Sequence, residues 1–193
     1  MDDAQLVERV VAGDGEAFRL LVERYQRQIH GLIARMVRDP ALAEDLAQET
    51  LIKAYRAIAT FDRKRRLSSW LFKIAHNTAI DHLRKKRPPT VPLESPEEER
   101  LDPLALLAEP ENRSPEARAR GRDLAEALQD ALMDLRPDYR EAVLLRFQQG
   151  LPYEEIAEIL ELPLGTVKTH LHRARGQMAK ALSEAGWGVG KQG

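Results

Sequence analysis

The sequence contains no cysteine, which excludes disulfide bonds, thiolate nucleophiles and thiolate zinc sites and suits a reducing compartment. Aromatic residues make up only 5% of the chain, whereas the strong helix formers Leu, Ala, Glu and Arg are abundant. No apolar run approaches the roughly 20 residues needed to cross a bilayer, and the first ten residues lack the basic and then apolar layout of a signal peptide. We therefore expect a helical, cytoplasmic protein that does not insert into the membrane.

Charge is strongly segregated along the chain, although the net charge is only −1. Positions 63–87 carry nine basic residues against the single acid Asp81, positions 94–116 carry eight acids against two arginines, and positions 164–182 carry four basic residues and no acid. Ordinary solvated surfaces more often mix the two signs. The two basic segments therefore favour a polyanionic partner, and nucleic acid in particular.

The chain is expected to divide into two small helical domains. Seven of its eleven prolines lie between positions 88 and 115, together with the acidic cluster, which is typical of a linker. Helical patterns occur on both sides of this segment, and the last residues are rich in glycine. We predict an all-α protein with a first domain over 1–88, a flexible linker over 89–114, a second domain over 115–185 and a flexible tail over 186–193.

Apolar periodicity and capping residues predict the individual helices. Asp39-Pro40 has the form of an N-cap followed by proline at the first helical position, and Ser68 or Ser69 is expected to cap a later helix. The first domain should contain helices over 4–11, 16–37, 40–59 and 69–86. The second should contain helices over 114–133, 137–150, 153–160 and 164–183.

The segment 153–181 predicts a helix-turn-helix. A short helix is followed by the turn Glu161-Leu162-Pro163 and by a longer helix, and in this motif the second helix reads the major groove of DNA. On that second helix, Val167, Leu171, Ala174 and Met178 share the core face, while the opposite face and its flanks are polar and basic. Arg173 has the chemistry to pair bidentately with guanine. A metal site at His170 and His172 is disfavoured, because residues two apart do not face each other on a helix.

The helix over 69–86 combines an aromatic ring, an amide and cations on its outer face. Trp70, Lys73, Asn77, Asp81 and Arg84 fall there, and such a stripe suits stacking on unpaired bases and contact with their backbone. Core packing at a helix start is the alternative interpretation of Trp70. The preceding loop, with Phe61 and four consecutive cations, favours a nucleic-acid surface.

The helix over 40–59 has a different outer face, formed by Asp45, Gln48, Glu49, Ile52 and Arg56. An exposed isoleucine among acids is a poor DNA surface but a suitable protein-docking surface. A merely solvated helix face is an equally good interpretation of this spacing.

Three segments together resemble the bacterial sigma factors of the sigma-70 family, in the extracytoplasmic-function (ECF) subgroup. The stretch DPALAEDLAQETLIKAYRAIATF resembles region 2.2 and SSWLFKIAHNTAIDHLRKKRP resembles regions 2.3 and 2.4. The stretch LRPDYREAVLLRFQQGLPYEEIAEILELPLGTVKTHLHRARGQM resembles region 4. His170 and His172 stand where many relatives have arginine or other residues, so promoter preference does not follow from the resemblance.

The resemblance implies roles for the three faces. Core RNA polymerase would bind Asp45, Gln48, Glu49, Ile52 and Arg56. The −10 promoter element and a flipped base would contact Phe61, Asp62, Arg63, Lys64, Arg65, Arg66, Trp70, Lys73, Asn77 and Arg84. The −35 element would contact Tyr153, Glu154, Thr166, Lys168, Thr169, His172, Arg173 and Arg175.

The sequence therefore predicts a transcription initiation factor without enzymatic activity, cofactor, metal or small-molecule substrate. Its expected partners are core RNA polymerase, promoter DNA and, by resemblance, an anti-sigma protein that is often held at the membrane. One alternative is a stand-alone DNA-binding regulator of LuxR type, which would leave Trp70 and the docking face unexplained. A histidine-dependent hydrolase is a third class, but no nucleophile or metal spacing supports it.

Overall fold

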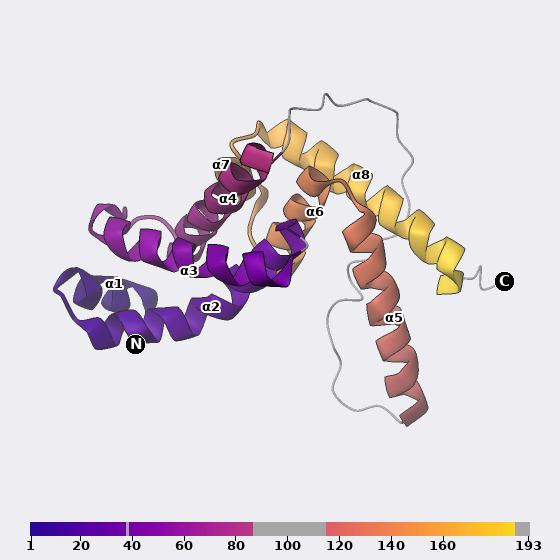
Figure 1. The fold of residues 1–193 in the computed structure, drawn as a ribbon. Coiled ribbons are helices and arrows are strands. Elements are labelled where there is room, and N and C mark those ends of the chain that lie inside the picture. Colours follow the sequence, from indigo (N-terminus) through magenta and orange to yellow (C-terminus); the bar gives the residue numbers. More distant parts are fainter. Residues whose placement is uncertain (38, 87–114, 188–193) are drawn as a thin grey trace. The chain divides into compact units, whose positions relative to one another are not determined.

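A computed structural model describes residues 1–37, 39–86 and 115–187, which are helical and contain no strand (Figure 1). The predicted all-α class is confirmed. The helices are α1 (Asp3–Val11), α2 (Gly15–Val37), α3 (Pro40–Ala57), α4 (Leu67–Lys86), α5 (Pro115–Asp134), α6 (Pro137–Val143), α7 (Tyr153–Leu160) and α8 (Leu164–Leu182). A 3-10 turn over Ile58–Thr60 follows α3, and π-helical turns over Leu144–Gln148 and Ser183–Trp187 follow α6 and α8.

The chain forms two compact units. Unit 1 comprises Met1–Pro92 and Leu151–Pro163, and unit 2 comprises Leu93–Gly150 and Leu164–Gly193. Within the described residues, unit 1 therefore contains α1–α4 and α7, and unit 2 contains α5, α6 and α8. The predicted linker over 89–114 and most of the predicted tail lie outside the described residues, and the domain boundaries given above remain predictions.

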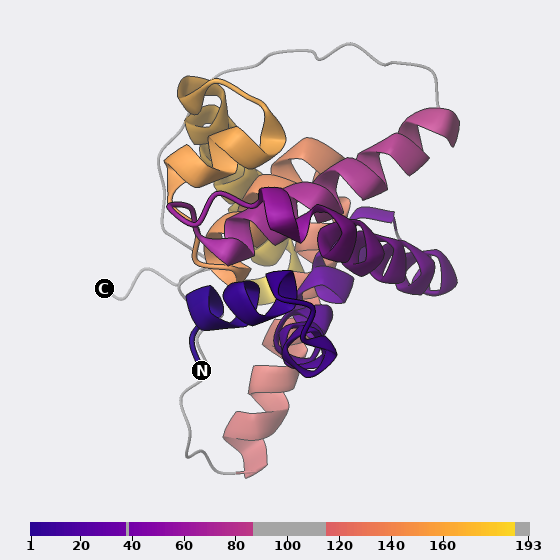
Figure 2. The same cartoon turned by 90° about the vertical axis from the view of Figure 1, so that its left-hand side faces the viewer.

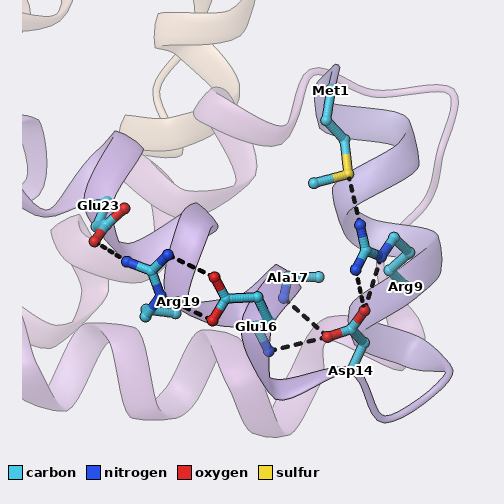
Figure 3. A network of polar contacts seen from close by, with 7 residues as sticks. All are labelled: Met1, Arg9, Asp14, Glu16, Ala17, Arg19 and Glu23. Carbon is cyan, nitrogen blue, oxygen red and sulfur yellow. Dashed lines mark hydrogen bonds and ion pairs between the residues drawn. The ribbon is translucent and has the colours of Figure 1, made fainter.

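The start of unit 1 is organised by helix caps. Asp2 caps α1 in a reciprocal capping box with Gln5. Gly13 then takes a left-handed conformation (φ +89°), and the Asp14 carboxylate accepts hydrogen bonds from the backbone N–H groups of Glu16 and Ala17 (Figure 3). The N–H of Ala17 and the guanidinium of Arg9 hold the pKa of Asp14 below its ordinary value. These contacts fix the turn between α1 and α2.

The core of unit 1 lies between α2, α3 and α4, with α1 against α2 (Figures 1 and 2). Helix α2 buries one residue per turn or more along a single stripe, which is the pattern that a 3.6-residue period predicts. Fully buried apolar side chains fill the centre of the unit: Leu6, Leu21, Ile29, Leu32, Ile33, Leu71 and Phe72.

The predicted cap of α3 is confirmed, whereas the predicted cap of α4 is wrong. The Asp39 carboxylate accepts from the backbone N–H of Leu42, and Pro40 occupies the first turn. Helix α4 begins at Leu67, so Ser68 and Ser69 lie inside its first turn. The reason is packing: Leu67 is 3% exposed, and burial of this apolar side chain places the helix start before the two serines.

Unit 2 packs α8 against α5 and α6. The face of α8 predicted to be the core, with Val167, Leu171, Ala174 and Met178, is buried. Arg140, which is 3% exposed, donates to the carbonyl oxygens of Leu132, Met133 and Leu135. A buried guanidinium thus satisfies carbonyls in the last turn of α5, which a helix leaves without intrahelical partners, and the carbonyl of Leu135 directly after it.

Candidate functional site

The first candidate surface, called here the α4 surface, consists of the loop before α4 and the outer face of that helix. Asp62 organises the loop, because its carboxylate accepts from the N–H of Lys64 and its carbonyl accepts from the N–H of Arg65. Arg63, Lys64, Arg65 and Arg66 are all exposed, as are Asn77, Asp81 and Arg84.

The two aromatic rings of the α4 surface lie together. The ring centroids of Phe61 and Trp70 are 5.2 Å apart, with the planes tilted by 51°, and both side chains are half-buried. Trp70 is therefore partly packed on Phe61 and partly open. The pair offers an aromatic edge beside the four cations of the loop, which is an arrangement that can stack on an unpaired base.

Acidic groups of α7 contact the α4 surface inside unit 1. Arg65 pairs with Glu158 at 3.0 Å, Arg66 with Glu155 at 3.8 Å and Lys73 with Glu161 at 3.2 Å. The Lys73 ammonium also donates to the carbonyl of Glu158, and the Ser69 hydroxyl donates to Glu155. Three of the predicted DNA-binding cations are therefore paired with carboxylates, and in the Arg65–Glu158 pair both side chains are more than half exposed.

The second candidate surface, the α3 surface, is the exposed face predicted for docking. Asp45, Gln48, Glu49, Ile52 and Arg56 are all exposed, and Ile52 is 50% exposed. The buried residues of α3 lie on the other side, at Ala43, Leu46, Ala47, Thr50 and Ala54.

The α3 surface also includes two aromatic residues that the sequence analysis missed. Tyr55 is 50% exposed, and its ring centroid lies 4.6 Å from that of Phe18 in α2. Tyr55 follows Ile52 by one helical turn, so the same periodicity that selected Ile52 could have found it. The contribution of Phe18 comes from α2 and could not be found from the spacing of α3. Ile52 and Tyr55 are exposed and Phe18 is half-buried beside Tyr55, so this apolar patch draws on both α3 and α2.

The third candidate surface, the α8 surface, is the polar side of α8. Lys168 and Thr169 are exposed, while Thr166, His172, Arg173 and Arg175 are half-buried. The Thr169 hydroxyl donates to the carbonyl of Gly165, and the Arg175 guanidinium lies 5.4 Å from the centroid of the Phe147 ring. Tyr153 and Glu154, the other predicted −35 residues, begin α7 in unit 1 and are half-buried and exposed respectively.

A polar cluster between α6 and α8 was also missed. The Tyr139 ring lies 4.9 Å from the ring of His170, and the Tyr139 hydroxyl accepts from Nη1 of Arg173 at 3.4 Å. The guanidinium of Arg136 lies 5.3 Å from the centroid of the same ring. Burial lowers the pKa of His170 below its ordinary value, and its Nδ1 is buried without a hydrogen-bond partner. Tyr139 and His170 come from different helices, so no spacing in the sequence joins them.

The described parts of the chain hold no group of three or more histidine, aspartate or glutamate side chains placed to bind a metal ion. Within the same residues, no helix is both long and apolar enough to cross a membrane.

Comparison with known proteins agrees with the resemblance. Residues 21–88 match the family Sigma-70 region 2, and residues 125–178 match Sigma-70, region 4. The chain is 45% identical over 183 residues to the RNA polymerase sigma-H factor of Pseudomonas aeruginosa, covering 93% of each chain. It is 39% identical over 177 residues to the ECF RNA polymerase sigma-E factor of Escherichia coli K12, covering 91% of each chain.

Solved structures of other proteins have a similar fold. The structure of CnrH in complex with the cytosolic domain of CnrY matches with a TM-score of 0.63 at 24% identity, covering 95% of this chain and 97% of that chain. The sigma factor RpoE in complex with the anti-sigma factor NepR from Bartonella quintana matches with a TM-score of 0.62, covering 86% and 96%. The chain therefore belongs to the sigma-70 family of RNA polymerase sigma factors, in its ECF group, and is a transcription initiation factor.

Proposed function

We propose that this factor binds core RNA polymerase through the α3 surface and reads two promoter elements with the α4 and α8 surfaces. In this proposal residues 1–88 form the polymerase-binding and −10 domain, residues 115–185 form the −35 domain, and residues 89–114 tether them. The factor has no enzymatic activity of its own. The observation that carries the proposal is that, among the described residues, α3 presents exposed apolar side chains while α4 and α8 present basic ones, in a chain of this family.

Polymerase docking is assigned to the α3 surface because of its exposed apolar area. Ile52 and Tyr55 are each half exposed, and Phe18 extends the patch onto α2. Protein interfaces concentrate their binding energy in a few buried apolar and aromatic side chains surrounded by polar groups. Asp45, Gln48, Glu49 and Arg56 supply that polar rim.

Promoter opening is assigned to the α4 surface. Loop cations would contact the DNA backbone, while Trp70, packed on Phe61, would stack on an unpaired base. Capture of an unstacked base offsets an unstacking cost of a few kcal/mol. The −35 element is assigned to the α8 surface, where Lys168 and Thr169 are exposed and Arg173 presents guanidinium donors. Two weak sites on one tethered protein bind more tightly than either alone, because the second contact is intramolecular.

Regulation by an anti-sigma protein is part of the proposal. One solved structure of similar fold, the sigma factor RpoE of Bartonella quintana, is a complex with the anti-sigma factor NepR. We place the factor in the cytoplasm, where it would be held inactive at the inner membrane face if its anti-sigma partner is membrane-bound.

The decisive experiment is run-off transcription from a promoter selected out of a random DNA pool with the reconstituted holoenzyme. We expect transcripts only when both the factor and core polymerase are present. Absence of any transcript, together with absence of binding to core polymerase, would contradict the proposal. A gel shift distinguishes the LuxR-type alternative, because a stand-alone regulator binds its operator tightly without polymerase.

The docking assignment has its own test. Ile52→Lys should weaken binding to core polymerase at least tenfold, since it places a charge at the centre of an apolar interface. Gln28→Lys adds the same charge at an exposed position of α2 and should bind like the wild type. Equal binding by both variants would remove the α3 surface from the interface.

A further inference from the structure

Helix α7 packs against α4 within unit 1 and presents a row of carboxylates to the α4 surface. The row consists of Glu155, Glu158 and Glu161, and residues three apart lie on one face of a helix. Each carboxylate pairs with a cation assigned above to the −10 strand, in the pairs Arg66–Glu155, Arg65–Glu158 and Lys73–Glu161. Carboxylate and phosphate groups are both anions that accept charge-assisted hydrogen bonds. The acidic row therefore offers the α4 surface the same chemistry as the backbone of a DNA strand.

Two further hydrogen bonds hold α7 at this place. The hydroxyl of Ser69 donates to the carboxylate of Glu155, and the ammonium of Lys73 donates to the carbonyl oxygen of Glu158 at 3.2 Å. Because the phosphates of a promoter strand and the carboxylates of α7 repel each other, the two cannot bind the same cations together. Binding of the strand therefore competes with the contact between α7 and α4.

Glu161 has an unusual backbone conformation for its residue type. It follows the end of α7 in the left-handed region, at φ +54°, where glycine is the usual residue. Glycine would adopt this turn without strain but would have no carboxylate to pair with Lys73. The turn alone does not account for a glutamate at this position, whereas the contact with α4 does.

We propose that α7 is an autoinhibitory element, whose acidic row occupies the cations of the α4 surface in the free factor until promoter DNA displaces it. This inference rests on the proposed function, in which the α4 surface binds the −10 strand. Exposed ion pairs are individually weak, so a strand can displace them. A strand held beside the factor on polymerase competes at a higher effective concentration than a strand in solution. The acidic row would thus restrict binding of −10 DNA to the holoenzyme.

The first test removes the negative charges of the row. It measures binding of the full-length factor, without polymerase, to a labelled single strand that carries the −10 element of a promoter selected by the holoenzyme. The variant replaces all three carboxylates, by Glu155→Gln, Glu158→Gln and Glu161→Gln. We expect binding to tighten about fivefold, since each exposed pair contributes little. A gain of this kind cannot arise from misfolding.

The matched control changes the net charge by the same amount elsewhere. It carries Glu8→Gln, Glu44→Gln and Glu126→Gln, at three exposed positions outside the proposed binding surfaces. Charges far from the α4 surface are screened by salt, so this variant should bind the strand like the wild type.

The second test holds the contact closed. The chain has no cysteine, so Ser69→Cys with Glu155→Cys supplies two unique thiols that a short bismaleimide can join. The crosslinked factor should bind the strand at least about tenfold more weakly than the same variant capped with a monomaleimide, because the tether keeps α7 at high effective concentration. Arg19→Cys with Glu23→Cys, a contacting pair on α2, is the control, and its crosslinking should leave binding unchanged.

The outcomes that contradict the proposal differ from those that contradict the proposed function. Autoinhibition by α7 is overturned if the first variant binds the strand no more tightly than its matched control, or does not bind it at all. It is also overturned if the thiols at positions 69 and 155 cannot be crosslinked, or if the crosslinked and capped forms bind alike. None of these results depends on run-off transcription, whose absence from the wild-type holoenzyme would instead contradict the proposed function.

Discussion

The α4 and α8 surfaces are both basic, but their arginines are held in different ways. On the α4 surface, Arg65 and its partner Glu158 are each 58% exposed. On the α8 surface, the guanidinium of Arg173 contacts the hydroxyl of Tyr139, which is 5% exposed. The first contact joins two side chains in solvent, whereas the second joins a surface side chain to the core.

This difference has a physical consequence. Exposed ion pairs contribute about 0–1 kcal/mol and are screened by salt, so a phosphate group can replace a carboxylate at little cost. The contact of Arg173 joins it to a buried hydroxyl group. In the proposed function, the α4 surface captures a strand as DNA opens and the α8 surface reads an intact duplex. Variants of Trp70, Arg173 and Glu158 test this contrast, and variants of Arg140 and His170 test the buried polar groups of unit 2.

The largest effect is expected from the buried polar groups of unit 2. Arg140→Met removes the donors that satisfy the carbonyls of Leu132, Met133 and Leu135. The carbonyl of Leu132 keeps the N–H of Leu135, whereas the carbonyls of Met133 and Leu135 each lose a guanidinium donor. Loss of a donor at a buried acceptor is costly, so we expect a loss of about 3 kcal/mol in the free energy of unfolding. Urea denaturation measures this loss. Arg122→Met, at an exposed position of α5, should change stability by less than about 0.5 kcal/mol, and similar losses in the two variants would refute the buried role of Arg140.

The next effect concerns the separate roles proposed for the two surfaces, promoter opening for the α4 surface and −35 recognition for the α8 surface. Trp70→Ala should reduce open-complex formation at least about fivefold, because stacking on one base contributes about 1–3 kcal/mol. It should leave the preference for an intact −35 element unchanged. Arg173→Ala should lower the preference for an intact −35 element and leave open-complex formation unchanged. Potassium permanganate reactivity of unpaired thymines measures opening.

Trp187→Ala is the control for Trp70→Ala, since it removes the other tryptophan of the chain, in the turn that follows α8. It should affect neither property. Equal loss of both properties in the Trp70 and Arg173 variants would contradict the contrast between the surfaces.

A smaller effect is expected from the carboxylates that contact the α4 surface. Glu158→Gln removes the ion pair with Arg65 and should strengthen binding of the isolated factor to single-stranded −10 DNA about twofold, since an exposed pair is weak. The gain should shrink at high salt. Glu126→Gln, an equal charge change at an exposed position of α5, is the control. A gain of the same size in that variant would mean that only net charge matters.

The smallest effect is a pH dependence from His170. Burial lowers the pKa of this group in the folded state, so the unfolded chain binds its proton more readily. The resulting stability is present above the unfolded pKa of about 6.5 and is lost as the pH falls through the lower folded value. We expect the wild-type Tm to drop between pH 7.5 and 5.5 by roughly 2 °C more than that of His170→Gln. Identical drops would show that His170 does not titrate in this way.

Much of the local structure could be predicted from the sequence. Asp39-Pro40 marked the start of α3, and the bounds of α7 were predicted as observed. The cap of α4 was misplaced, because the pattern favoured Ser68 or Ser69 while burial of Leu67 set the helix start. A capping residue is a local signal, and here the burial of Leu67 in the core determined the helix start instead.

For the candidate surfaces, too, the sequence identified residues within one helix but not contacts between helices. Ile52 is exposed as predicted, whereas Trp70 and Arg173 were predicted on the outer faces of their helices and are half-buried. Tyr139 was overlooked because its importance depends on Arg173, 34 positions away. The assigned binding roles of all these residues stay predictions.

By itself, the sequence determined the helical class, the order of the helices, the segregation of charge and the family, because periodicity, capping and motif spacing are properties of neighbouring residues. Only the tertiary structure decided which side chains meet: Phe18 with Tyr55, Tyr139 with Arg173, and Arg65 with Glu158. The physical reason is that such pairs come from different helices, and their distances are set by how the helices pack.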